Sequence, residues 1–178
     1  MAFGLLFRSV PTLAEINAMD RARFVATLGH LFEHSPWVAE ETWPQRPFRD
    51  AQQLHGALCS TMRAAPRERQ LALIRAHPDL AGRLAQQQHL TADSTREQAS
   101  AGLHALSAQE LAEFQRFNDV YRQKFGFPFV ICARLNAKDA ILAAMKQRLT
   151  HSLEREFDAA LNEIEKIAAL RWKDAVAV

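Results

Sequence analysis

One stretch of this chain carries large apolar side chains at every third or fourth residue, and that spacing constrains the fold most. The residues are Leu111, Phe114, Phe117, Tyr121 and Phe125. This period places them on one face of an α-helix, which predicts a helix from about residue 108 to 125 packed into a core. Gly126 follows, and glycine is the residue that most often ends a helix in the left-handed conformation.

Similar signals recur along the chain, whereas alternation of period two is almost absent and only six glycines are present. Sheet is therefore not expected. The pattern predicts an all-α fold, a compact multi-helix bundle in which residues 1–178 form a single domain. The further helices are expected at about 12–34, 36–43, 50–64, 66–77, 80–87, 137–149 and 153–172, with capping boxes at Thr12/Glu15, Ser94/Glu97 and Ser107/Glu110.

The segment from Phe127 to Ala133 is the one strand-like run. Pro128 and the lack of a partner strand argue against a sheet, so we expect an extended, buried connector. Its simplest role is to fill the core. Alternatively, its backbone donors and acceptors lack helical partners and must bond something else, and a planar ureide ligand would suit them.

Charge and composition exclude several classes of protein. The net charge is only +2, and basic and acidic residues are interspersed, so no nucleic-acid partner is expected. No apolar run approaches the roughly 18 residues of a membrane span. Cys59 and Cys132 are far apart and fit small apolar fillers in a reducing compartment. Neither a signal peptide nor a peroxisomal address is apparent, so a cytoplasmic location is expected.

His77 is the first candidate for acid/base chemistry. It precedes Pro78 at the expected end of a helix, where a histidine can simply bond the last carbonyl groups. In the functional interpretation, its imidazole titrates near neutral pH and acts as a general acid/base from a rigid corner.

Glu97 is the second candidate. Within Ser94-x-x-Glu97 its carboxylate could only cap a helix. In the functional interpretation, it orients the imidazole of His77 and sets its charge. The expected helix start from Ser94 to Gln98 could also hold an anionic or carbonyl-rich ligand.

His30 and His34 lie four residues apart, a spacing that can chelate a metal on a helix face. They do not form the His-Glu-x-x-His motif, because Glu33 occupies the wrong position. Two alternatives to an acid/base enzyme stay open. One is a metal-dependent hydrolase using His30 and His34, and the other is a non-catalytic helical interaction module.

Several ordered motifs together resemble the OHCU decarboxylases, which act on 2-oxo-4-hydroxy-4-carboxy-5-ureidoimidazoline. The similarity runs from about residue 10 to Trp172. The motifs are Glu33-x-Ser35-Pro36-Trp37, His77-Pro78-Asp79-Leu80-Ala81-Gly82, Ser94-x-x-Glu97-Gln98-x-x-x-Gly102-Leu103, and Asn118-x-x-Tyr121-x-x-Lys124-Phe125-Gly126 continuing through Phe127 to Ala133.

The resemblance implies an all-helical homodimer without cofactor or metal that forms (S)-allantoin in the last step of urate degradation. It also implies that His77 is the catalytic acid/base and that Glu97 assists it. The substrate, a small ureide, would be held by Arg171 or Arg134. The remaining residues implied in the substrate pocket are Pro78, Ser94, Gln98, Phe129, Val130, Ile131, Cys132 and Ala133.

Overall fold

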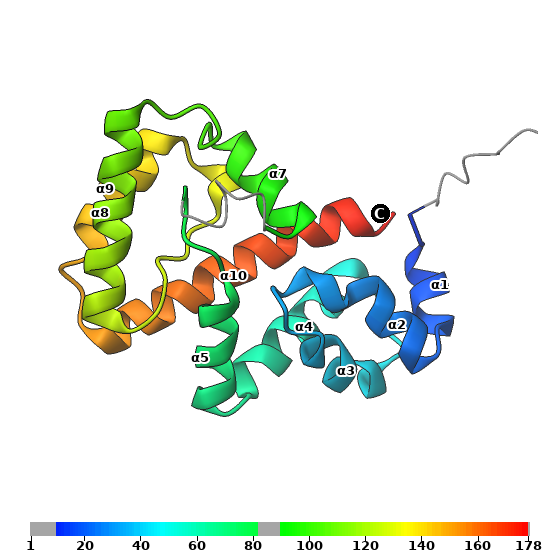
Figure 1. Ribbon diagram of the computed structural model, residues 1–178. Helices are drawn as coiled ribbons and strands as arrows, with labels where there is room; N and C mark the ends of the chain where they lie inside the picture. Colours follow the sequence, from blue (N-terminus) through cyan, green and yellow to red (C-terminus); the bar gives the residue numbers. More distant parts are fainter. Residues whose placement is uncertain (1–9, 82–89, 178) are drawn as a thin grey trace, which may run out of the picture.

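The computed structural model describes residues 10–81 and 90–177, and the regular structure in this part of the chain is helical (Figure 1). Pairing of sheet type is limited, in those residues, to one isolated bridge between Thr12 and Ala177. The predicted all-α fold is confirmed. The α-helices and short 3₁₀ helices (η) are α1 (Leu13–Ala18), α2 (Arg21–Leu28), η1 (Gly29–Leu31), α3 (Trp37–Thr42), η2 (Trp43–Gln45), α4 (Ala51–Ala64), α5 (Arg67–Ala76), α7 (Ala92–Ser100), α8 (Ala108–Phe125), η3 (Ala133–Leu135), α9 (Lys138–Arg148) and α10 (Leu153–Ala175).

The long helix α10 organises the molecule. Figure 1 shows it crossing the whole fold, with α8 and α9 near its beginning and α7 beside its C-terminal half. It also contacts α2, η1, α4 and α5. Its inward face carries apolar side chains at intervals of three and four residues, and all of them are buried: Phe157, Leu161, Ile164 and Ile167. None of the helices in the described ranges is long and apolar enough to cross a membrane.

The predicted single helix over residues 12–34 is wrong, because the chain breaks it twice. Met19 is extended, and Asp20 starts α2 by accepting a hydrogen bond from the Arg23 amide at 2.8 Å. An aspartate at such a break competes with the backbone and favours a new helix start. After Leu28 the chain tightens into η1 and then turns at His34, whose φ is +46°.

Helix α8 follows its prediction closely. Ser107 and Glu110 form the expected capping box, and Gly126 ends the helix with a φ of +76°. The predicted apolar face is buried, except that Leu111 is only half-buried. The predicted helix at about 80–87 lies almost entirely outside the described residues, and Leu80 and Ala81 form a turn.

The capping box predicted at Ser94 and Glu97 is wrong. Helix α7 begins one turn earlier, where the Thr91 hydroxyl accepts a hydrogen bond from the Ser94 amide at 3.2 Å. Ser94 therefore lies inside the first turn of the helix and is buried. Because the cap is supplied by Thr91, the Glu97 carboxylate is left to make contacts elsewhere.

Residues 127–132 form the extended, buried connector that the sequence predicts. Long side chains bind its backbone in place of a partner strand. The Cys132 amide donates to Glu163 Oε2 at 2.8 Å, and the Val130 carbonyl accepts from Arg148 Nη1 at 2.8 Å. The short helix η3 follows, so the connector joins α8 to η3 and α9 along the chain.

Candidate active site

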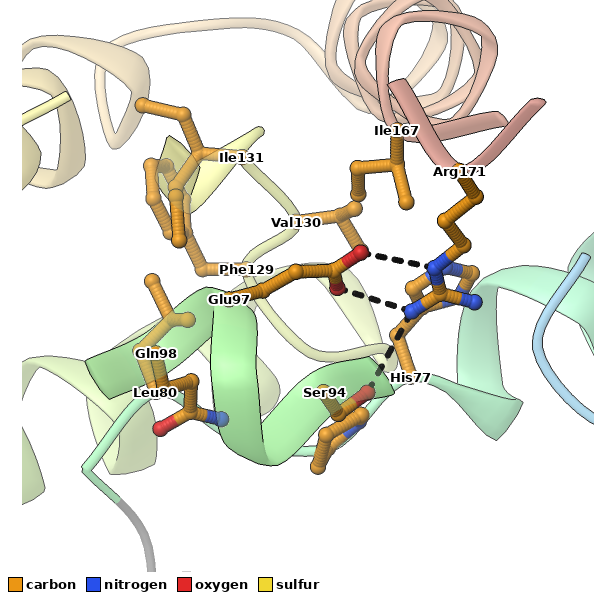
Figure 2. Close-up of a pocket in the computed structure, with 12 residues that line it drawn as sticks. His77, Leu80, Ser94, Glu97, Gln98, Phe129, Val130, Ile131, Ile167 and Arg171 are labelled. Carbon is orange, nitrogen blue, oxygen red and sulfur yellow. Dashed lines mark hydrogen bonds and ion pairs between the residues drawn. The ribbon is translucent and has the colours of Figure 1, made fainter. Parts of the chain in front are cut away.

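A small pocket lies where the end of α5, one face of α7, the connector and α10 meet (Figure 2). The four segments are far apart in the sequence, and each contributes side chains. Most of the lining is apolar, and the polar groups are concentrated on α5, α7 and α10. The lining residues are His77, Pro78, Leu80, Ser94, Glu97, Gln98, Phe129, Val130, Ile131, Ala133, Ile167 and Arg171.

His77 follows the last residue of α5, as expected for the end of that helix. Its Nδ1 lies 2.9 Å from the Leu73 carbonyl oxygen. Because a carbonyl can only accept, Nδ1 carries the hydrogen when the ring is neutral, and Nε2 has a free lone pair. The capping interpretation and the functional one are therefore compatible, because the two ring nitrogens serve different purposes.

The electrostatic surroundings keep the His77 imidazole neutral at physiological pH. The side chain is only 6% exposed, and burial lowers its pKa below the usual range. The bond to Leu73 and the charge of Glu33 act in the opposite direction, and they do not outweigh burial. A neutral imidazole with a free Nε2 can accept a proton.

Arg171 holds Glu97 through both carboxylate oxygens. Nε lies 2.7 Å from Oε1, and Nη2 lies 2.8 Å from Oε2. Figure 2 shows this paired contact above Ser94, with His77 beside the guanidinium. Glu97 is thus fixed by Arg171 rather than by a hydrogen bond to the imidazole, although its charge raises the pKa of His77.

Glu33 is the member of this site that residue-by-residue reasoning missed. It is 3% exposed, and its Oε2 accepts from Arg171 Nη2 at 2.8 Å. Its Oε1 accepts from the hydroxyls of Thr91 at 2.8 Å and Ser94 at 3.1 Å. Burial would raise the pKa of Glu33, but Arg171 and Thr91 hold it below the usual range. The available signal was the Glu33-x-Ser-Pro-Trp motif.

Arg171 is consequently shared between two carboxylates. Glu33 and Glu97 carry two negative charges against its single positive one, so the trio has an excess of one negative charge. The two carboxylates raise the pKa of Arg171 despite burial, which alone would lower it. An anionic ligand that used Arg171 would have to compete with a carboxylate already in place.

Gln98 braces the turn that follows His77. Its Oε1 accepts from the Ala81 amide at 3.0 Å, and its Nε2 lies 3.4 Å from the Asp79 carbonyl oxygen. The Asp79 carboxylate is bound in turn by Arg122 Nε at 2.9 Å. Gln98 therefore lines the pocket and also fixes its rim.

Two predicted pocket residues lie elsewhere. Arg134 pairs with Asp174 at 2.6 Å in a second, polar pocket, which shares Glu97 and Arg171 with the first. Cys132 is buried beside the first pocket but does not line it. The structure brings the other predicted residues together and adds two apolar ones that were not predicted, Leu80 and Ile167.

His30 and His34 do not share a helix face. His30 lies in η1 and His34 in the turn after it, and both are exposed. Within residues 10–81 and 90–177, no group of three histidine, cysteine, aspartate or glutamate side chains is arranged to hold a metal ion. The metal-site alternative therefore has no geometric support in the described part of the chain.

Comparison with known proteins agrees with this geometry. The family model described as OHCU decarboxylase matches residues 17–173. A protein of Haloferax volcanii named 2-oxo-4-hydroxy-4-carboxy-5-ureidoimidazoline decarboxylase is 46% identical over 90% of this chain and 93% of its own length. A protein of the same name from Halalkalicoccus jeotgali is 43% identical over 92% and 90%.

A solved structure shows the same architecture. The crystal structure of an (S)-allantoin synthase superposes with a TM-score of 0.76 and 28% sequence identity. The match covers 94% of this chain and 54% of that chain, so the present protein spans about half of the longer one. The extent of the family match, together with relatives above 40% identity over nearly the whole length, shows that this chain belongs to the OHCU decarboxylase family.

Proposed function

We propose that this protein decarboxylates 2-oxo-4-hydroxy-4-carboxy-5-ureidoimidazoline to (S)-allantoin in the pocket lined by His77 and Glu97. The observation that carries the proposal is the placement of both side chains in one small pocket, opposite the connector. Family membership supports the same substrate. The pocket combines an apolar wall with a single titratable imidazole, which suits the loss of a carboxylate followed by one proton transfer.

The reaction can proceed without an added electron sink. When the bond from C4 to the carboxylate breaks, its electron pair forms a C4=C5 double bond, and the C5=N imine electrons move to nitrogen, which takes a proton. The resulting enol then loses its hydroxyl proton as the C4 carbonyl forms, and C5 takes a proton. Carbon dioxide and allantoin are the products, and the face on which C5 is protonated sets the stereochemistry.

His77 is the residue proposed to handle the proton. Its Nδ1 is held by the Leu73 carbonyl, so the ring cannot turn without losing that bond. Nε2 is left to take the proton from the C4 hydroxyl and return one to C5 on a single face. A positioned imidazole of this kind contributes about 10²–10⁴-fold to rate.

Glu97 and Arg171 are proposed to act through charge. The negative charge of Glu97 favours the imidazolium form that His77 reaches during the reaction. Arg171 is bound by Glu97 and Glu33, so the substrate carboxylate would draw it partly away from Glu97. The second cationic candidate, Arg134, is paired with Asp174 and is not proposed as an anchor.

The connector forms the wall of the pocket that faces His77 and Glu97. Phe129, Val130 and Ile131 line the pocket, and in the described residues the Ile131 amide has no protein hydrogen-bond partner. A buried amide of this kind gains free energy by binding a ligand oxygen. The ureido carbonyl of the substrate is the group proposed to meet it.

The two rival hypotheses require different arrangements of side chains. A non-catalytic module does not need His77 and Glu97 at one pocket, whereas this chain keeps both there. A metal-dependent hydrolase needs ligands that His30 and His34 do not supply as a pair. The homodimer, the cytoplasmic location and the single domain over 1–178 stay predictions.

Circular dichroism of allantoin formation tests the proposal. Fresh substrate is made from urate with urate oxidase and 5-hydroxyisourate hydrolase, with and without this protein, and with EDTA in a parallel sample. We expect rapid formation of the (S)-allantoin signal that EDTA does not change. Slow, racemic allantoin in every sample would refute the proposed activity, and loss of activity in EDTA would favour the metal hypothesis.

A further inference from the structure

A second buried polar cluster lies outside the pocket, where α8, α9 and α10 meet. Its members are Tyr121, Arg148, His151 and Glu156. Glu156 is 0% exposed and Arg148 is 8% exposed. Burying an ion pair rarely stabilises a fold more than apolar residues of the same size would, so stability alone does not account for the cluster.

The Glu156 carboxylate is fully used within the cluster. Its Oε1 accepts from Arg148 Nε at 2.8 Å, and also from Arg148 Nη2 and the Tyr121 hydroxyl. Its Oε2 lies 2.8 Å from His151 Nδ1. Glu156 therefore binds the guanidinium of Arg148 directly, and Tyr121 and His151 hold the Glu156 carboxylate in place, so the guanidinium has a single orientation.

The other side of that guanidinium faces the connector. Arg148 Nη1 donates to the Val130 carbonyl at 2.8 Å, and its Cζ lies 4.4 Å from the centre of the Phe129 ring. The Tyr121 ring meets the same Phe129 ring edge-on at 5.2 Å. Phe129 and Val130 are two of the residues that line the pocket. The cluster therefore binds the two residues, Phe129 and Val130, that form one wall of the pocket.

We infer that Arg148 is a positioning residue that fixes the wall of the pocket formed by Phe129 and Val130. It does not line the pocket itself, and it acts through the backbone carbonyl and the aromatic ring that it binds. The inference rests on the proposed function in assigning this wall to the substrate. Its structural half, that Arg148 holds the connector, stands independently of the reaction.

Arg148→Lys separates the charge of this side chain from its planar shape. A lysine keeps a positive charge beside Glu156, so the carboxylate is not left buried without a partner. It lacks the planar fork that binds Glu156 and Val130 together and stacks on Phe129. Arg67→Lys is the matched control, because Arg67 also pairs with a glutamate of α10 (Glu154, 2.9 Å) and stacks on a phenylalanine (Phe157, 4.1 Å).

The first readout is amide hydrogen exchange in the ligand-free protein. The reporter is the Cys132 amide, which binds Glu163 two residues beyond Val130. In Arg148→Lys we expect its exchange to rise about tenfold or more, which corresponds to about 1.4 kcal/mol. Arg67→Lys is expected to leave it unchanged. Equal exchange in the wild type and Arg148→Lys would overturn the inference.

The second readout is the kinetic effect. With the wall loosened, we expect KM in Arg148→Lys to rise about tenfold while kcat stays within about threefold, and the affinity for (S)-allantoin to fall in parallel. A merely structural role would lower the amount of active protein and leave KM alone, and that outcome would contradict the inference. An inactive wild type would instead refute the proposed function, and the exchange data would still decide whether Arg148 holds the connector.

A double variant provides a second test in case Arg148→Lys does not fold. Arg148→Met combined with Glu156→Gln removes both charges at once, so no unpaired charge stays buried. The glutamine can still bond Tyr121 and His151. We expect the same rise in Cys132 exchange as in Arg148→Lys, because both variants lose the bond to Val130. Wild-type exchange in this folded double variant would also overturn the inference.

Discussion

Arg171 binds both carboxylate oxygens of Glu97, with Nε 2.7 Å from Oε1 and Nη2 2.8 Å from Oε2. The pair joins the last long helix to α7 across the pocket. Glu33, which lies between η1 and α3, binds the same guanidinium, so Arg171 ties together three distant parts of the chain. The site and the tertiary fold therefore depend on the same buried charges.

Arg171→Met should be strongly destabilising. It leaves Glu33 and Glu97 without their counter-charge, and breaking a buried pair in this way costs about 3–5 kcal/mol. Urea denaturation measures the free energy of unfolding. The control is Arg67→Met, whose side chain is 53% exposed and whose ion pair is worth about 0–1 kcal/mol. Equal losses in the two variants would show that the Arg171 cluster is not a structural tie.

The pH dependence of kcat/KM should report the neutral imidazole of His77. Burial lowers the pKa of His77, so the base is fully available at neutral pH and is lost only as pH falls through that lowered value. The acidic limb should therefore lie below the ordinary histidine pKa of about 6.5. An acidic limb above 6.5 would contradict the neutral-base assignment.

Glu97→Gln should move that limb further down. The charge of Glu97 raises the pKa of His77, so removing the charge disfavours the imidazolium form. We expect a lower kcat together with an acidic limb at lower pH than in the wild type. Glu154→Gln, an exposed change on α10, serves as the control and should alter neither quantity. A limb that stays in place would mean that Glu97 does not act on His77 through charge.

Gln98→Ala should impair both folding and catalysis. It removes the hydrogen bond to the Ala81 amide and the contact with Asp79, which brace the turn after His77. A net loss of about 1–3 kcal/mol in unfolding free energy is expected. We expect kcat/KM to fall about tenfold or more, since small misplacements of a catalytic group are costly. Gln123→Ala, at an exposed position of α8, should match the wild type in both assays.

Local sequence signals predicted most of the helices because each signal is strong where nothing competes with it. Helix α8 has a capping box, an apolar face and a terminal glycine that agree with one another. At Asp20 a second start signal falls inside the helix predicted over residues 12–34, and at Thr91 a start signal lies three residues before the one at Ser94. Spacing alone does not rank them, so the break before α2 and the earlier start of α7 were missed.

The candidate site was predictable to the extent that its residues lie in recognisable motifs. His77 and Glu97 lie in such motifs, Arg171 is implied by the same family resemblance, and all three line the pocket. Ion pairing between distant segments was not predictable. Whether an arginine is free or already paired depends on tertiary contacts, which is why Arg134 was assigned to the pocket and Glu33 was overlooked.

The most direct test of the account compares His77→Asn with His104→Asn in the circular dichroism assay of (S)-allantoin formation. An asparagine at 77 can still donate to the Leu73 carbonyl but has no group in place of Nε2. His104 makes a similar contact, with Nδ1 3.1 Å from the Ala99 carbonyl oxygen, but it is exposed and does not line the pocket. We predict a loss of about 10²–10⁴-fold in kcat for His77→Asn and wild-type activity for His104→Asn. Enantioselective turnover that survives in His77→Asn would contradict the assignment of His77 as the proton-handling residue.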